Sequence, residues 1–276
     1  TEGELPGAYD VTLANFDGTG SLDVAASSWR IGNQFAWFKN HHGKWSKHII
    51  DENSPETRTV ITADINGNGR TDLVGTITDG NEIVWYENPG GSATQAWKKH
   101  VIDVTTHPMH GNITDMDGDG DIDLVMAILG SGQHSKGKFH TREEWVPNNL
   151  DDSEFQQIVW YENNGTPEKS PWQKHIISAL FPYAFEAIAA DIDNDGHTEV
   201  VATAWSDTEK GSIALFKHRG NPRGHWDMHL LKTNWTHANQ VILADLNNNG
   251  RLDIIACAER GSNELRWWRN EGSDTD

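Results

Sequence analysis

The chain has little cysteine: Cys257 is the single one among 276 residues. One thiol cannot form an intramolecular disulfide, so a disulfide framework is excluded and stability must come from packing and bound metal. Cys257 lies in the apolar segment Ile-Ala-Cys-Ala, which predicts a buried position on a strand.

Positive charge is also scarce. The chain has 22 lysine and arginine residues against 41 acids, and its net charge is −19. No basic stripe is available to neutralise phosphates, so we do not expect a nucleic-acid partner. No apolar run is long enough to cross a membrane as a helix, so membrane insertion is not expected either.

Segments with the helical period are lacking as well. Short stretches alternate apolar and polar residues instead, and Gly, Asn and Asp punctuate them. This pattern is typical of short strands joined by turns, so the sequence predicts an all-β protein.

What the chain has in abundance is one acidic signature, Asp-x-Asp-x-Asp-Gly-x-x-Asp in its fullest form. It recurs at residues 15–23, 64–72, 115–123, 191–199 and 245–253, here called loops 1 to 5. Oxygen ligands at positions 1, 3 and 5 can converge on a calcium ion, a glycine at position 6 permits a sharp turn, and an acid at position 9 closes the site. An EF-hand has its closing acid three residues later, before a helix. The signature therefore predicts calcium loops between strands.

The predicted calcium ligands are the side chains at positions 1, 3, 5 and 9. They are Asn15, Asp17, Asp23, Asp64, Asn66, Asn68, Asp72, Asp115, Asp117, Asp119, Asp123, Asp191, Asp193, Asp195, Glu199, Asp245, Asn247, Asn249 and Asp253. Ligand charge tunes calcium affinity. Loops 3 and 4 have acids at all four positions and are expected to be strongest. Loop 1 has Asn15 first and Thr19 at position 5, so it is the one we expect to be empty.

Each loop belongs to a longer repeat of about 50 residues. An apolar strand follows the loop, then an aromatic strand such as Val84-Trp-Tyr-Glu-Asn88, then a strand with a Trp-x-x-His motif. The histidines of that motif are predicted to be framework. Four-stranded tandem units predict the blades of a β-propeller. We predict one domain over 1–276, with an insertion at 130–155 and blades at 8–51, 57–103, 109–178, 185–232 and 238–271.

The fifth repeat lacks the residues that form the fourth strand in the other repeats. We expect the last blade to be incomplete, to be completed by the first residues, or to belong to a longer propeller. An open edge strand favours self-association.

The loop, the apolar strand and the Trp-Tyr-Glu-Asn strand together resemble the FG-GAP/VCBS repeats of calcium-binding propellers. The resemblance covers residues 8–271 and implies a propeller with calcium loops, although the family usually has more than five blades. Such repeats occur in integrin α-subunit heads, lectins and sugar-processing enzymes, so the resemblance does not specify a function.

Candidate functional residues precede the loops by five to eight positions, at the start of each blade's first strand. In a propeller this place lines the central channel. Unlike the loops, these residues differ in every blade: Asp10, Thr59, His110, Glu186 and Gln240, with Tyr9, Arg58, His107, Tyr183 and His237 nearby. The candidate catalytic residues are His110, Tyr183, Glu186, His107, His237 and Arg58. They suit an acid–base pair or a further divalent metal; alternatively they hydrogen-bond one another and water.

Several functions are open. Trp29, Trp205 and Trp235 lie outside the repeat's regular positions and either stack on sugar rings or pack between blades. The insertion, with His134, His140, Glu143 and Trp145, is predicted to cover a channel mouth. Non-repeating residues favour a single site, and we predict carbohydrate engagement there.

The alternatives are a metal-dependent carbohydrate lyase or dehydratase that works by β-elimination, and a protein-interaction module. The pair Met109-His110 resembles a pair in sugar dehydratases of the aldos-2-ulose type, a likeness that favours the enzyme. Middling-affinity calcium loops suit millimolar calcium, so a secreted or periplasmic location is expected.

Overall fold

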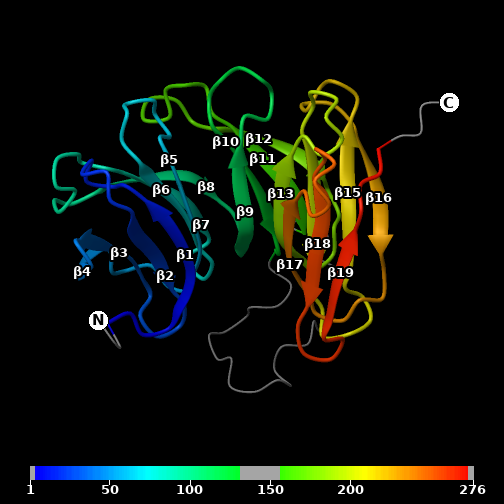
Figure 1. Cartoon of the computed structure of the whole chain (residues 1–276), viewed down its shortest axis with the longest axis horizontal. Coiled ribbons are helices and arrows are strands. Elements are labelled where there is room, and N and C mark those ends of the chain that lie inside the picture. Colours follow the sequence, from blue (N-terminus) through cyan, green and yellow to red (C-terminus); the bar gives the residue numbers. More distant parts are fainter. Residues whose placement is uncertain (1–3, 131–155, 273–276) are drawn as a thin grey trace. The chain divides into compact units, whose positions relative to one another are not determined.

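The computed structural model of the chain describes residues 4–130 and 156–272. Every regular element among these residues is a β-strand (Figure 1). The strands are β1 (Ala8–Ala14), β2 (Asp23–Ser28), β3 (Gln34–His41), β4 (Lys44–Asp51), β5 (Thr57–Ala63), β6 (Asp72–Ile77), β7 (Glu82–Glu87), β8 (Lys98–Val104), β9 (Pro108–Thr114), β10 (Asp123–Ile128), β11 (Gln157–Glu162), β12 (Gln173–Ser178), β13 (Ala184–Ala190), β14 (Glu199–Ala204), β15 (Ser212–His218), β16 (Trp226–Lys232), β17 (Ala238–Ala244), β18 (Asp253–Ala258) and β19 (Glu264–Trp268). The all-β prediction is confirmed. The candidate residues of the insertion, His134, His140, Glu143 and Trp145, lie outside the described residues.

The strands form sheets in the predicted order. The first two repeats are the four-stranded sheets β1–β4 and β5–β8, and the fifth is the three-stranded sheet β17–β19. The third and fourth repeats join through β9 and β13 into one eight-stranded sheet. The sequence predicted separate blades here. The amide of Asn112 on β9 accepts from Ala189 N at 2.9 Å and donates to Ala189 O at 3.1 Å, which ties the two first strands together.

Burial explains the pattern of each repeat. The second strands β6, β10 and β14 are buried on both faces, because nearly all of their side chains are apolar. Outer strands such as β4 and β8 bury fewer side chains. The repeated tryptophans Trp37, Trp85 and Trp160 are fully buried.

Three of the four repeated histidines, His48, His100 and His175, stack on a repeated tryptophan as framework, whereas His229 is exposed. The ring of His100 stacks on Trp85 with centroids 4.1 Å apart, and its Nε2 lies 3.2 Å from Glu87 Oε2. His175 stacks on Trp160 in the same way at 4.4 Å.

Asparagines at the end of the aromatic strand clasp the preceding repeat. The Nδ2 of Asn88 donates to Phe16 O at 2.9 Å, and Nδ2 of Asn163 donates to Ile65 O at 3.0 Å. Each carbonyl belongs to position 2 of a loop, so the clasp orients that loop as well as joining two repeats.

The chain divides into two compact units. Unit 1 comprises Thr1–His110 with Asn163–Gln173, and unit 2 comprises Gly111–Glu162 with Lys174–Asp276. The single domain inferred from the repeats remains a prediction. In the part of the chain that the structure describes, no helix is long and apolar enough to cross a membrane.

Cys257 is half-buried, not buried as predicted. It lies on β18 opposite Leu265, whose side chain is 76% exposed, so this face of the three-stranded sheet is not covered as in the earlier repeats. β19 is an edge strand of this sheet. Self-association through it remains a prediction.

Candidate functional site

Each of the five loops connects the first strand of a blade to the second. The aspartate at position 1 organises the turn: Asp64 Oδ1 accepts from Asn68 N at 2.9 Å and Oδ2 from Gly69 N at 2.7 Å. Gly69 has a φ of 80°, a left-handed conformation that favours glycine. Loops 4 and 5 place Asn194 and Asn248 in the left-handed region at position 4, and asparagine tolerates it.

The acid at position 9 is fully buried and binds backbone. Asp72 Oδ2 accepts from Ile65 N at 3.1 Å and Oδ1 accepts from Asn88 N at 2.8 Å. The same pair of contacts occurs at Asp23 and Asp253. Burial raises the pKa of Asp72 to about 7. The closing acid therefore fixes the loop to the aromatic strand, and only its remaining lone pairs can face an ion.

Two loops gather carboxylates closely enough to hold a metal ion. Oxygens of Asp115, Asp117 and Asp123 lie within 4.8 Å of one another, and so do those of Asp191, Asp193 and Glu199. These are loops 3 and 4, the acid-rich loops of the sequence prediction. Asp193 Oδ1 is buried without a hydrogen-bond partner, which suits a cation ligand. The residues present therefore fit a hard divalent ion.

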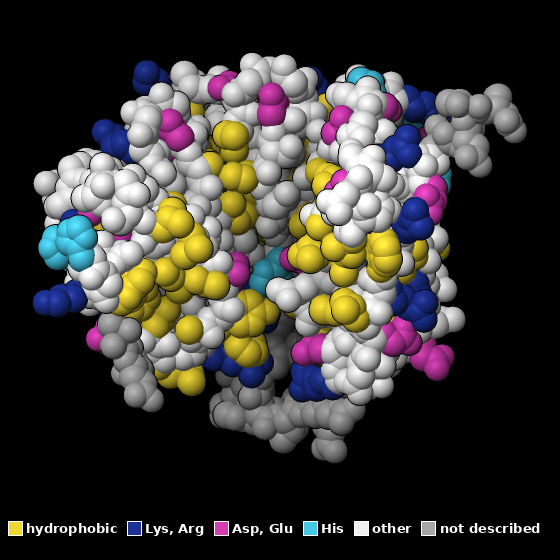
Figure 2. Space-filling model, viewed as in Figure 1, with side chains coloured by type: hydrophobic (Ala, Val, Ile, Leu, Met, Phe, Trp, Pro, Cys, Tyr) yellow, Lys and Arg dark blue, Asp and Glu magenta, His cyan; other side chains and the backbone are white. Residues whose placement is uncertain are grey.

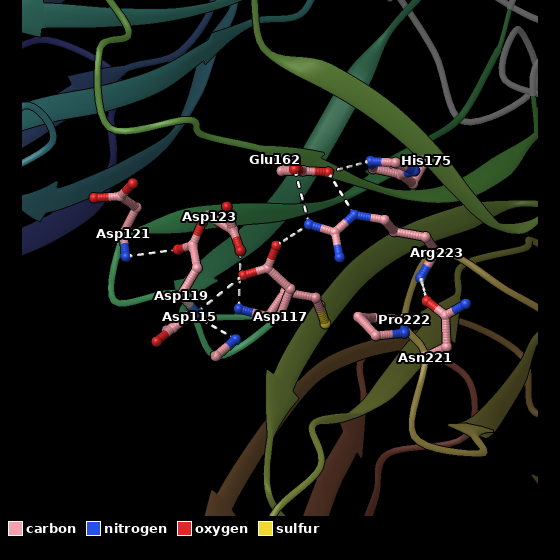
Figure 3. Close-up of polar contacts among 12 residues, drawn as sticks. Asp115, Asp117, Asp119, Asp121, Asp123, Glu162, His175, Asn221, Pro222 and Arg223 are labelled. Atoms are coloured by element: carbon pink, nitrogen blue, oxygen red, sulfur yellow. Dashed lines mark hydrogen bonds and ion pairs between the residues drawn. The ribbon is translucent and has the colours of Figure 1, made fainter.

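Basic side chains reach three loops, and the sequence did not predict them. Lys39 Nζ lies 2.7 Å from Asp17 Oδ2 in loop 1, and Lys217 contacts Asp193 in loop 4. In loop 3, Arg223 contacts Asp117 and pairs with both oxygens of Glu162, as Figure 3 shows. The Arg223 hydrogen bonds lower the pKa of Glu162.

A second set of functional side chains gathers in unit 1 around Tyr9. We call Tyr9, Trp29, Arg58, Thr59 and His110 the Tyr9 cluster. Sequence reasoning singled out Arg58 and His110 but left Tyr9 out of the catalytic candidates. Tyr9 is 40% exposed, and its ring stacks on His110 with centroids 5.6 Å apart.

Hydrogen-bond directions in the Tyr9 cluster can be assigned. Thr59 Oγ1 donates its one proton to Met109 O at 2.9 Å, so His110 Nδ1–H donates to Thr59 Oγ1 at 3.0 Å. The other nitrogen, Nε2, then accepts from the Tyr9 hydroxyl at 3.2 Å, and Arg58 Nη1 donates to the same hydroxyl at 3.3 Å. The chain of donors runs from Arg58 through Tyr9 to a neutral His110.

Burial and the positive charge of Arg58 lower the pKa of His110 to about 3. An unfolded histidine, with a pKa of about 6.5, takes up a proton that native His110 does not. The free energy of unfolding should therefore fall as the pH is lowered from 6.5 towards 3.

Between pH 6.5 and 5 the wild-type protein is expected to lose about 1.6 kcal/mol more unfolding free energy than His110→Gln. Urea unfolding at these two pH values measures it. His41→Gln, at an exposed position, is the control. Equal pH dependence in wild type and His110→Gln would contradict the assignment.

The Tyr9 cluster continues into buried charged groups. Arg58 and Glu56 are 6% and 7% exposed, and their closest nitrogen and oxygen are 4.0 Å apart. Arg58 Nε and Glu56 Oε2 are buried without hydrogen-bond partners. Arg30 covers a face of Trp29, with Cζ 3.8 Å from the ring centroid. Burial, assisted by the charge of Asp79, raises the pKa of Glu56.

Tyr9 also lines a groove on the sheet β1–β4. The cavity has a volume of about 520 Å³, and its lining includes Asp10, Val11, Phe38 and Trp45. Apolar side chains gather over β1 and β2 on this face (Figure 2). Trp45 is 40% exposed, as Tyr9 is, so two of the three aromatic residues of the groove are accessible.

The remaining candidates have structural contacts. Glu186 Oε2 accepts from Val241 N at 2.6 Å, just as Asp10 Oδ2 accepts from Val60 N at 2.9 Å, so each acid joins two first strands. His237 is 1% exposed, lies 2.6 Å from Asp207 and contacts the Arg260 carbonyl.

His107, Tyr183 and His237 occupy one repeated position. With Gly7 and Glu56 they have φ between 49° and 74°, so this place is a left-handed turn before the first strand. Tyr183 is 4% exposed, and His107 lies 3.9 Å from Asp79. The position constrains their backbone, and their catalytic roles remain predictions.

The irregular tryptophans mostly pack. Trp205 is 7% exposed and donates to Glu259 Oε1 at 2.7 Å, and Trp235 is fully buried against Trp268. A further divalent metal was predicted near His110. Among the described residues, sets of three converging ligands occur at loops 3 and 4 and not in the Tyr9 cluster.

Solved structures with similar folds were found. An alpha-L-arabinofuranosidase from Lactobacillus brevis has 9% identity and a TM-score of 0.50, with 98% of this chain and 93% of that chain covered. CoXyl43, a GH43 beta-xylosidase/alpha-arabinofuranosidase from a compost microbial metagenome, has 11% identity, coverage of 96% and 93%, and a TM-score of 0.48. A lectin from Aleuria aurantia has 9% identity, coverage of 96% and 76%, and a TM-score of 0.48.

At such identities the likeness shows the fold alone, a β-propeller of about five blades. No curated protein matches the chain. A family model described as FG-GAP-like repeat matches residues 15–75, 64–126 and 191–256. These matches cover more than half of the chain, which therefore belongs to the FG-GAP-like repeat family.

Proposed function

We propose that this chain is a calcium-stabilised propeller, secreted or periplasmic, that binds a carbohydrate in unit 1. The ligand lies in the groove on β1–β4 and reaches the Tyr9 cluster. The observation that carries the proposal is that Tyr9 belongs to both: it lines the groove, and its hydroxyl bonds to Arg58 and His110.

The groove suits a sugar in shape and chemistry. Its volume of about 520 Å³ is in the range of small-molecule pockets. Trp45 and Tyr9 present half-exposed rings, and such rings stack on the apolar faces of sugars.

The Tyr9 cluster and the buried charges beyond it supply donors and acceptors for hydroxyl groups. Buried polar atoms without hydrogen bonds cost free energy; Arg58 Nε, on the side chain that donates to Tyr9, is one, and Glu56 Oε2, 4.0 Å from Arg58 Nη2, is another. A hydroxyl both donates and accepts, so it can satisfy a guanidinium and a carboxylate together once the side chains adjust.

Calcium is the proposed ion of loop 3. The ligands of this loop are oxygens and their charge is high, which suits calcium. Loop 3 would hold the ion with Asp115, Asp117, Asp119 and Asp123. The ion would fix the loop between the two strands that it joins, and it takes no part in binding sugar at the groove.

Binding to a panel of neutral and acidic oligosaccharides, measured by isothermal titration calorimetry, tests the proposal. Trp45→Ala is expected to weaken binding about tenfold, because one stacking contact is worth roughly 1 kcal/mol or more. Trp267→Ala is the matched control, since Trp267 is 49% exposed and lies in unit 2. Equal losses in both variants would contradict the groove site.

A second candidate, β-elimination, is favoured by the chain from Arg58 through Tyr9 to His110. Tyr9, as a phenolate that has lost its proton to water, would take the proton from the carbon next to a carbonyl or carboxylate, while neutral His110 keeps the Tyr9 oxygen in place. The C–H electrons would form the new C=C bond, and the β-oxygen would leave with its electron pair and pick up a proton from water. Arg58 would stabilise the phenolate.

The enzyme candidate predicts a conjugated alkene, which absorbs in the ultraviolet, when the protein is mixed with acidic polysaccharides or keto-sugars. Tyr9→Phe should abolish the signal while leaving binding within about threefold, because stacking is kept. Binding without any alkene would leave the carbohydrate-binding function, and neither result would favour the protein-interaction module.

A further inference from the structure

One position of the aromatic strand changes charge from blade to blade. This position comes directly before the repeat position that Asn88 occupies in blade 2. In blades 1 to 5 its residues are Lys39, Glu87, Glu162, Lys217 and Arg269. In the two blades with lysine, the ammonium group reaches the position-3 aspartate of its own loop. Lys39 Nζ lies 2.7 Å from Asp17, and Lys217 contacts Asp193.

We propose that Lys39 and Lys217 are tethered cations that take the place of a metal ion in loops 1 and 4. An ammonium group, like calcium, binds carboxylate oxygens. Because it is attached to the adjacent strand, its effective concentration at the loop is high. A calcium ion would have to displace it or tolerate its charge.

Loop 1 has few other ligands for a metal. Position 1 is Asn15, and Thr19 at position 5 donates its hydroxyl proton to Asp17 Oδ1 at 2.7 Å. Both oxygens of Asp23 accept backbone N–H groups. The Asp17 side chain is 1% exposed, so Lys39 neutralises a buried charge.

Loops 3 and 4 both have acids at the four ligand positions, and loop 3 adds Asp121, but the surroundings of the two loops differ. Arg223 beside loop 3 is paired with Glu162 through Nε at 3.0 Å and Nη2 at 2.8 Å, so an acid from outside the loop balances its charge. The acids that interact with Lys217 are those of loop 4 itself, Asp193, Asp195 and Glu199. Counting Asp121 in loop 3 and Lys217 at loop 4, loop 4 is therefore two charges less negative toward calcium than loop 3.

A matched pair of variants separates the two loops. Asp117→Asn and Asp193→Asn change the same position in loops 3 and 4. Calcium bound per chain is measured by equilibrium dialysis and affinity by calorimetry. Asp117→Asn should weaken one site about tenfold or remove it, whereas Asp193→Asn should leave calcium binding unchanged. Equal losses in the two variants would overturn the proposal.

Removing the lysine charge gives the opposite test. Lys217→Gln should add one calcium site or strengthen a weak one about tenfold, because a like charge beside the ion is gone. Lys39→Gln should add none, since loop 1 has too few acids. Lys210→Gln, in an exposed turn, is the control. Unchanged calcium binding in Lys217→Gln would contradict the proposal.

This inference rests on the proposed calcium binding of the loops, and the two fail separately. If the wild-type protein binds no calcium but Lys217→Gln does, the proposal for Lys217 is supported and the proposal of calcium in the wild-type loops is contradicted. If the wild-type protein binds calcium as tightly in loop 4 as in loop 3, the proposal of calcium in the loops is supported and the proposal for Lys217 is contradicted.

Discussion

Chelation of calcium is expected to lower the melting temperature of the wild-type protein by roughly 10 to 30 °C. An ion at 100 times its dissociation constant stabilises the native state by about 2.7 kcal/mol. Two or three such sites add about 5 to 8 kcal/mol, and each kcal/mol shifts the melting temperature of a protein of this size by about 2 to 4 °C. The loops are expected to need the ion because their carboxylates repel one another at close range.

Differential scanning calorimetry with calcium, with a chelator, and with calcium restored after chelation measures this effect. Restored calcium should recover the original melt. Magnesium at the same concentration should recover less of it, since magnesium demands a stricter octahedral geometry. A melt that chelation does not change would refute structural calcium.

Asp72→Ala is expected to cost about 3 kcal/mol of unfolding free energy, with or without calcium. The substitution leaves the N–H groups of Ile65 and Asn88 buried without their acceptor, and each lost bond costs about 1 to 3 kcal/mol. Because those bonds do not involve the metal, a chelator should not hide the loss.

Asn66→Ala is the matched control for Asp72→Ala. Asn66 is a predicted ligand in the same loop and is only half-buried. Asn66→Ala should therefore lower the unfolding free energy when calcium is present and have little effect in chelator. Urea unfolding of both variants under the two conditions gives the four values needed. If the stability lost in Asp72→Ala also vanished in chelator, the acid at position 9 would stabilise the protein mainly by binding the metal and not by its hydrogen bonds to the backbone.

The sequence predicted the fold well because the loop stands at the same place in every repeat and so marks the ends of the strands. Each loop marks where a first strand ends and a second begins, and the structure places β6 at Asp72–Ile77, directly at the closing acid. The joining of β9 to β13 was not predicted, because it depends on Asn112 meeting Ala189 far along the chain.

The candidate site was predicted only in part, for a related reason. Arg58 and His110 were singled out by their distance from a loop, and the structure joins them through Tyr9. Tyr9 stands at a corresponding position, yet only the fold shows that its hydroxyl lies between them. Trp45 belongs to the repeat and was not among the candidates, but its blade leaves it 40% exposed.

The cations at the loops could not be foreseen either. A motif read along the chain reports ligands in sequence order, whereas Lys217 reaches Asp193 from the aromatic strand and Arg223 reaches Asp117 from a turn. Equal ligand sets in loops 3 and 4 therefore concealed unequal environments.

The most direct test of the proposed function is calorimetric titration of the calcium-loaded wild-type protein and of Arg58→Gln with the oligosaccharide panel. The proposal predicts one site per chain for at least one oligosaccharide, with binding at least tenfold weaker in Arg58→Gln, since hydrogen bonds to a charged group are worth about 1.5 to 3 kcal/mol. No binding by the wild-type protein, or equal binding by a folded Arg58→Gln, would contradict it.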